Sequence, residues 1–138
     1  MKGFFRIVAI VIFMSGVLFS CNTFSPEKLA GEWNVVELKG EAVVPTDRTP
    51  FLGFDVKDSR IYGFTGCNRI TGTLDAEQLL KGKPDFSRMG STRMMCHDDK
   101  YETKFLEALS SADKAECKGQ EIILSDKEGS ILVRLRKR

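Results

Sequence analysis

Short stretches in which apolar and polar side chains alternate dominate the chain beyond its N-terminal region. In residues 51–56, Leu52, Phe54 and Val56 occupy every second position, so they fall on one face of an extended strand. Residues 60–64 continue in the same way after a short polar turn. Two strands joined so closely are typical of an antiparallel hairpin.

Further extended stretches predict the rest of a β-rich fold. Three closing strands are expected near residues 113–118, 121–125 and 130–136, separated by polar turns that contain glycine. A short strand is expected over residues 84–89. Residues 76–83 are polar and are expected to form a loop.

One segment has helical periodicity instead. Over residues 98–110, Tyr101, Phe105 and Leu109 recur every four positions, which places them on one apolar stripe. The aspartates at the start of this segment are expected to cap the helix.

Together these elements predict one domain that is mainly β, and α+β by content. We expect about eight short antiparallel strands, arranged as a β-meander that closes into a small barrel-like sheet, with one amphipathic helix at about 98–110. The sequence contains no internal repeat and no composition shift that would mark a second domain.

The N-terminal region has the order of a secretory signal peptide. Lys2 and Arg6 precede an apolar stretch, Ile7 to Phe19, that is too short for a comfortable transmembrane helix. The run Leu18-Phe19-Ser20-Cys21 resembles a bacterial lipobox. This resemblance implies that Cys21 is acylated and becomes the first residue of the mature protein.

The expected organisation is a lipoprotein signal peptide over residues 1–20, a lipidated tether over 21–26 and a β domain over 27–138. Asn22, which would follow the lipidated cysteine, fits the outer-membrane sorting pattern of enteric bacteria. We therefore expect a protein of the cell envelope, lipid-anchored at the outer membrane and facing the periplasm. The lipid on Cys21 makes the membrane its first expected partner.

The charge balance argues against nucleic acid as a partner. The chain has 21 Lys and Arg against 19 Asp and Glu, and removing Lys2 and Arg6 with the signal peptide leaves 19 of each. A chain with this balance has no overall attraction for nucleic acid. The basic residues near the C-terminus alternate with Ile131, Val133 and Leu135, which favours a strand with a solvated face.

The cysteines predict a disulfide more readily than a metal site. If Cys21 carries lipid, Cys67, Cys96 and Cys117 remain in an oxidising compartment, but their spacing does not identify a pair. Zinc sites use closely spaced ligands, and the adjacent Cys96 and His97 face opposite sides of an extended chain. We therefore expect no metal and no cofactor, and we expect Cys117 to be a small core residue.

No motif in the sequence predicts an active site. His97 is the only histidine, and a nucleophile at Cys96 or Ser91 would need an orienting group and an oxyanion hole besides. The chain has no nucleophile elbow, phosphate loop or zinc-protease motif. We expect a protein with no catalytic residues, which is not an enzyme.

Several motifs in order resemble those of the META domain, the family of HslJ-like heat-shock-associated and secreted bacterial proteins. They are Leu29 to Trp33, Gly66-Cys67-Asn68-Arg69 with Gly72, Thr92-Arg93-Met94-Met95-Cys96, and Phe105 to Leu109. The resemblance covers about residues 27–136. It implies a small, mostly β, barrel-like domain with one helix and a disulfide between Cys67 and Cys96. The family's links to stress, antibiotic resistance and motility are physiological, and it implies no defined molecular activity.

If that disulfide forms, it brings two polar segments together. Asn68, Arg69, Thr92 and Arg93 would then lie near one rigid place and form a binding surface for an anion or a partner's carboxylate. A purely structural role is the competing hypothesis. In that case Asn68 would adopt a left-handed turn conformation and Arg93 would satisfy loop carbonyls.

The functional expectation is a non-enzymatic binding or interaction module with an envelope-stress-related role and an unknown envelope protein as its partner. One alternative is a carrier of a small apolar ligand, because barrels of about eight strands can enclose one molecule. The other alternative is an accessory or inhibitory subunit of a larger envelope complex, which an exposed apolar patch would favour.

Overall fold

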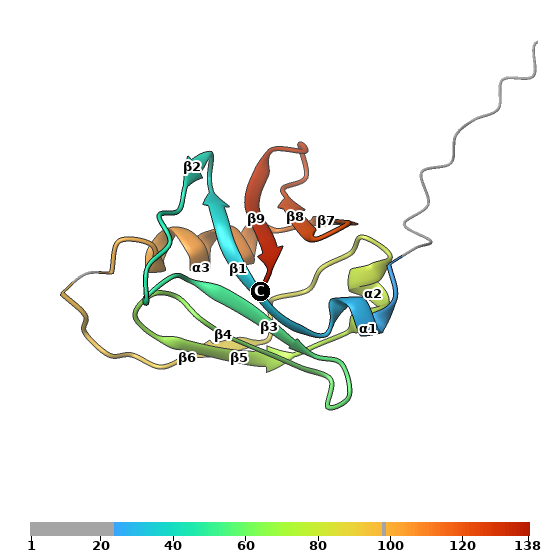
Figure 1. Ribbon diagram of the computed structural model, residues 1–138, viewed down its shortest axis with the longest axis horizontal. Helices are drawn as coiled ribbons and strands as arrows, with labels where there is room; N and C mark the ends of the chain where they lie inside the picture. Colours follow the sequence, from blue (N-terminus) through green and yellow to red (C-terminus); the bar gives the residue numbers. More distant parts are fainter. Residues whose placement is uncertain (1–23, 98) are drawn as a thin grey trace, which may run out of the picture.

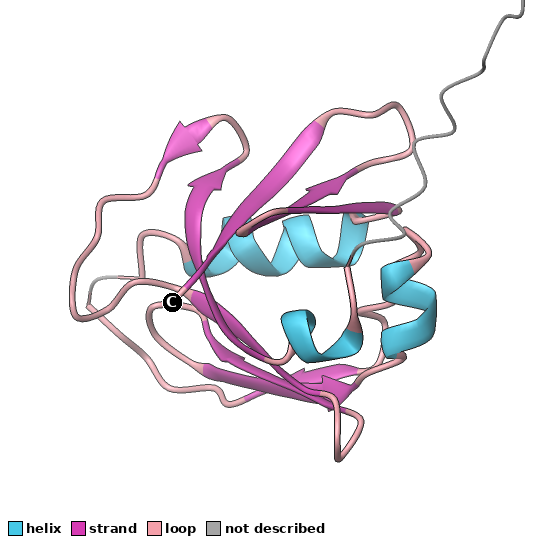
Figure 2. Cartoon of the chain, turned by 45° about the vertical axis from the view of Figure 1, so that its right-hand side comes forward, coloured by secondary structure: helices cyan, strands magenta, loops and turns pink. Residues whose placement is uncertain are grey.

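The computed structural model describes residues 24–97 and 99–138 and shows a strongly curved antiparallel sheet with helices on its concave side (Figures 1 and 2). In chain order the elements are α1 (Pro26–Leu29), β1 (Gly31–Leu38), β2 (Glu41–Ala42), β3 (Phe51–Asp55), β4 (Arg60–Phe64), β5 (Arg69–Thr73), α2 (Ala76–Leu80), β6 (Met89–Ser91), α3 (Glu102–Ser111), β7 (Lys114–Lys118), β8 (Glu121–Ser125) and β9 (Ile131–Lys137).

The sheet consists of two meanders joined by its longest strands. Its order is β6-β5-β4-β3-β1-β9-β8-β7, and the short β2 pairs with β1 beyond this path. Every pairing between the described strands is antiparallel. The predicted hairpin is confirmed as β3 and β4, which pair from Phe51 opposite Phe64 to Asp55 opposite Arg60.

The prediction of a mainly β, antiparallel fold is confirmed, but the sheet is open and does not close into the expected barrel-like form. β6 and β7 are its two ends, and they do not pair with each other. The segment after α2 covers the β7 edge, where the Ala115 N–H donates to the Gly82 carbonyl at 3.0 Å. Closure is unnecessary because the chain protects this edge without a further strand.

The core lies between the sheet and the helices. Alternate residues of β1 and β3 point inward, and Trp33, Leu52 and Phe54 are at most 2% exposed. Phe105 of α3 is completely buried, and this helix packs against β1 and β9. The Trp33 indole N–H donates to the Leu29 carbonyl at 2.9 Å, so its polar atom is satisfied inside the core.

The main helix begins later than predicted. It runs from Glu102 to Ser111 instead of over residues 98–110, and no side chain caps its N-terminus. Asp99 contributes only its backbone carbonyl, which accepts a hydrogen bond from Glu102 N–H in the preceding turn. Residue 98 lies outside the described part of the chain.

Part of the predicted loop at 76–83 is a short helix, α2. The carboxylate of Asp75 accepts a hydrogen bond from Gln78 N–H at 3.0 Å, and Leu79 is buried in the core. Asp75 is therefore the N-cap of α2. The strand predicted over residues 84–89 is also wrong, since β6 begins only at Met89.

The basic C-terminal cluster forms the predicted strand with a solvated face. On β9, Arg134 pairs with Glu37 at 3.2 Å, and Arg136 pairs with Glu121 at 2.9 Å. The segment predicted to be a signal peptide and the predicted lipidation site Cys21 lie outside the described residues. Within the described residues, no helix has both the length and the apolar character needed to cross a bilayer.

Candidate functional site

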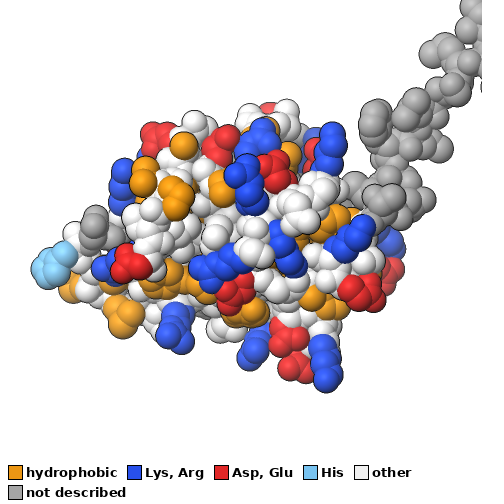
Figure 3. All heavy atoms as spheres, viewed as in Figure 1, with side chains coloured by type: hydrophobic (Ala, Val, Ile, Leu, Met, Phe, Trp, Pro, Cys, Tyr) orange, Lys and Arg blue, Asp and Glu red, His pale blue; other side chains and the backbone are white. Residues whose placement is uncertain are grey.

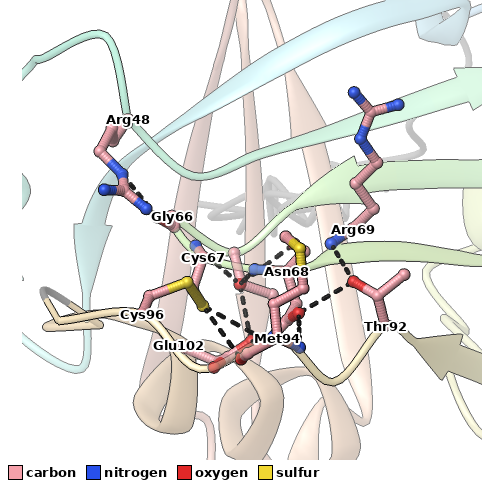
Figure 4. The surroundings of a disulfide bond; sticks show 10 residues. Arg48, Gly66, Cys67, Asn68, Arg69, Thr92, Met94, Cys96 and Glu102 are labelled. Carbon is pink, nitrogen blue, oxygen red and sulfur yellow. Dashed lines mark hydrogen bonds between the residues drawn. A yellow bond between two sulfur atoms is a disulfide. The ribbon is translucent and has the colours of Figure 1, made fainter.

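A disulfide joins the two motif segments. Cys67, in the turn between β4 and β5, is bonded to Cys96, in the loop between β6 and α3, with their Cα atoms 5.8 Å apart (Figure 4). Cys67 is only 2% exposed. The pairing implied by the family resemblance is therefore present, whereas Cys117 is buried in β7 and takes no part in the bridge.

The side chain of Asn68 is the centre of a buried hydrogen-bond network beside the disulfide. Its amide nitrogen donates to Glu102 Oε1 at 2.7 Å and to the Met94 carbonyl at 3.2 Å. Its amide oxygen accepts from Met94 N–H at 2.7 Å and from the Thr92 hydroxyl at 2.9 Å. Because Asn68 is 3% exposed, this one amide takes the place of water for polar groups of the loop after β6 and of the first turn of α3.

Thr65 extends the network on the other side of the turn. Its hydroxyl oxygen accepts hydrogen bonds from the N–H groups of Cys67 at 3.2 Å and Asn68 at 2.8 Å. The same hydroxyl donates to Glu102 Oε1 at 2.9 Å. The carboxylate of Glu102 thus ties the first turn of α3 to the β4–β5 turn, and a negative charge is favourable at that end of a helix.

The backbone of the turn depends on Gly66 rather than on Asn68. Gly66 has φ +96°, in the left-handed region, whereas Asn68 does not have a positive φ. The left-handed conformation considered for Asn68 is therefore wrong. The Arg48 guanidinium donates from Nε to the Gly66 carbonyl at 3.2 Å. This carbonyl therefore has a hydrogen-bond partner that lies outside the turn.

The structure places the four residues of the predicted binding surface in different roles. Asn68 and Thr92 belong to the network, and the Arg69 backbone is joined to it, since Arg69 N–H donates to Thr92 Oγ1 at 3.0 Å. The Arg69 side chain points away from Asn68 (Figure 4). Arg69 and Arg93 are both exposed, and neither guanidinium has an ion pair or hydrogen bond within the described residues.

Thr65 and Glu102 were missed by sequence reasoning. The spacing of Thr65 and Asn68 is the signal for Thr65, because a hydroxyl often accepts from an N–H two or three residues later. Glu102 gives no comparable signal, because its three-residue spacing from Asp99 is equally typical of a capping box. Its actual partners lie more than 30 residues away in the chain.

The described residues contain no cluster of three His, Cys, Asp or Glu side chains that could hold a metal ion. Cys67 and Cys96 are bonded to each other, and His97 is exposed on the loop that follows. The site is therefore built from a disulfide, neutral polar groups and one carboxylate.

An open antiparallel sheet with a disulfide and a buried polar network between two of its loops defines a small disulfide-containing β domain. The chain belongs to the META domain family, whose model matches residues 27–138. No curated protein matches the chain at a significant level.

Two solved structures share the fold. A protein solved by NMR is 18% identical with a TM-score of 0.56, over 82% of this chain and 94% of that protein. A DUF4847 family protein from Bacteroides vulgatus is 16% identical with a TM-score of 0.53, over 80% of this chain and 94% of its own. Neither META nor DUF4847 is known as a family of enzymes.

Proposed function

We propose that this protein is a lipid-anchored component of the cell envelope whose META domain acts as a non-enzymatic binding or interaction module in the response to envelope stress. The lipobox-like run ending at Cys21 supports the anchor. The disulfide between Cys67 and Cys96 supports an oxidising compartment such as the periplasm.

The binding role is supported mainly by one observation: a rigid backbone, held by the disulfide and Asn68, presents an Arg69 guanidinium that has no partner within the described residues. The disulfide and Asn68 hold the β4–β5 turn against the loop after β6, so Arg69 begins β5 from a rigid base. Its guanidinium has no partner within the described residues. A preorganised, exposed arginine is well suited to bind a carboxylate, because little backbone freedom is lost on binding.

A carrier of a small apolar ligand is less well supported. Such a protein needs interior space, but the inside of the curved sheet is filled by large side chains, with Trp33, Phe54 and Phe105 at most 2% exposed. An accessory or inhibitory subunit is the stronger second candidate, because aromatic side chains also lie on the outer face of the sheet, where a partner can reach them.

Replacing both Arg69 and Arg93 with alanine tests the binding role. We expect the melting temperature to change by no more than about 2 °C, because exposed side chains without partners contribute little to stability. The same variant should fail to complement the stress phenotype of a deletion strain. A variant that melts several degrees lower yet still complements at permissive temperature would contradict the proposal.

Replacing Cys21 with alanine tests the anchor. We expect the wild-type protein in the membrane fraction and the variant as released or unprocessed protein, because lipid attachment requires the thiol. Cell fractionation with detection of the mature chain measures this. If the Cys21→Ala protein is still cleaved after residue 20 and remains membrane-bound, the chain is not a lipoprotein.

A further inference from the structure

The outer face of the sheet carries an aromatic groove next to Arg69. Leu52, Ile61 and Ile70 point into the core, so the alternate residues of β3, β4 and β5 lie on the opposite face. There they surround a groove of about 640 Å³. Its walls include Glu32, Phe51, Tyr62, Phe64, Arg69 and Thr71. Figure 3 shows hydrophobic side chains among Lys and Arg in the lower part of the molecule, where β3 to β6 lie.

The aromatic rings of this groove support one another. The Phe51 ring centroid lies 6.4 Å from those of both Tyr62 and Phe64. The Tyr62 ring rests directly on Gly53, where an added Cβ would approach ring atoms to 2.2 Å. Glycine at this position thus permits close approach of the ring to the backbone. These contacts within the protein hold the rings in place, so the floor of the groove is already formed before a partner binds.

The charges around the floor leave one cation unpaired. The carboxylate of Glu32 accepts a hydrogen bond from the Arg138 guanidinium, which also donates to Asn34 Oδ1 at 2.8 Å and covers the Phe51 ring at 4.4 Å. Glu32 is therefore compensated within the protein. Arg69, directly opposite Phe64 in the register of β4 and β5, has no such partner within the described chain.

Tyr62 adds a neutral hydrogen-bonding group. Burial raises the pKa of Tyr62 above its usual range, and the nearby carboxylates of Glu32 and Asp55 act in the same direction. The phenol therefore stays protonated well above neutral pH. The floor remains uncharged, and Arg69 is the group that attracts an ionic partner.

A second groove continues from the first toward the edge of the sheet. It has a volume of about 330 Å³, shares Arg69, Ile70 and Thr71 with the first, and reaches Gly90 and Thr92. The combined surface is long and shallow. This shape suits an extended chain better than a small molecule, which usually requires a deep pocket that buries most of its surface.

We infer that this groove binds an extended acidic segment of a partner protein, with a carboxylate on Arg69 and the apolar side chain two positions away on the ring of Phe64. The inference rests on the proposed binding role and names the class of partner. Aromatic residues and arginine are the residue types that contribute most at protein interfaces. The guanidinium supplies two parallel donors to a carboxylate, which fixes the position of the acidic residue.

Fluorescence anisotropy with labelled octapeptides tests this inference on the full-length lipoprotein in a non-ionic detergent. The probe places glutamate and leucine two positions apart, so that both lie on one face of an extended chain, and two further probes carry glutamine or lysine in place of glutamate. We expect the glutamate probe to bind most tightly and Arg69→Glu to weaken its binding by about tenfold or more. Arg69→Glu should also improve binding of the lysine probe.

Arg88→Glu is the matched control, since it makes the same charge change at an exposed arginine that lines a different surface pocket. It should leave binding of the glutamate probe nearly unchanged. Equal effects of the two variants, equal binding of the glutamine probe, or no binding of any peptide would overturn the inference. So would binding only to phosphatidylglycerol vesicles, or self-association that Arg69→Glu abolishes. The proposed function is tested separately, by the Cys21 fractionation and by the complementation experiment, so its failure can be distinguished from failure of this inference.

Discussion

Replacing Asn68 with alanine is expected to lower the free energy of unfolding by about 2–4 kcal/mol. The change removes the amide that satisfies Met94 N–H, the Met94 carbonyl and the Glu102 carboxylate. Water does not easily replace it, because the side chain is 3% exposed and the disulfide holds the loop in place. Each buried group left without a partner costs about 1–3 kcal/mol.

Thermal and urea unfolding of purified protein measure this effect. A loss of that size corresponds to a melting temperature about 8–16 °C lower in a domain of this size. The neighbouring Arg69→Ala is the matched control and should stay within about 0.5 kcal/mol of the wild type, because its side chain is exposed and unpaired. If Asn68→Ala is as stable as Arg69→Ala, the network does not hold the two segments together.

Removing the disulfide is the second large expected effect. Cys67 and Cys96 are 29 residues apart, so their bridge restricts a sizeable loop in the unfolded chain. The chain-entropy relation gives about 3–4 kcal/mol for such a loop. We expect a loss of this order for the double replacement Cys67→Ser and Cys96→Ser, and a similar loss when the wild type is reduced.

Urea unfolding with and without reductant measures both losses. Reductant should not destabilise the double variant further, which separates the bridge from other effects of the reagent. Peptide mapping of the unreduced protein should recover Cys67 linked to Cys96. A peptide that links Cys117 to either cysteine, or a reduced wild type as stable as the oxidised protein, would contradict this assignment.

The strands were predictable because a buried sheet face imposes a period of two on the sequence. Leu52 and Phe54 on β3 show this period clearly, and the hairpin with β4 follows from it. The short elements had no such signal. Helix α2 has five residues, and its existence depends on the Asp75 cap and on burial of Leu79, which is a tertiary contact. The open sheet likewise depends on a tertiary contact, since the segment after α2 covers the β7 edge.

The candidate site was predictable in part. Residue types and family motifs brought Asn68, Arg69, Thr92 and Arg93 together as a group. Only the three-dimensional structure separates the buried amide of Asn68 from the exposed guanidinium of Arg69. The two residues are adjacent in sequence but face opposite sides of the turn region, and a sequence alone does not distinguish a scaffold from a contact surface.

The outer groove was missed for a related reason. Phe51, Tyr62 and Phe64 are aromatic residue types that are often buried, so nothing in the sequence marks them as residues of an outer face. Their place on the outer face follows from the register of β3 and β4 together with the space above Gly53. Since a shift of register by one residue would exchange the two faces, such a surface becomes visible only once the pairing is known.

The role of Arg69 is tested most directly by crosslinking the protein in intact cells, followed by purification and identification of the attached proteins. It should be performed in parallel on the wild type, Arg69→Glu and Arg88→Glu, with the melting temperature of each protein measured as well. We predict that the wild type and Arg88→Glu capture the same partner and that Arg69→Glu is equally stable but loses it. Capture of an identical set by all three proteins would contradict the claim that Arg69 and its groove form the binding surface.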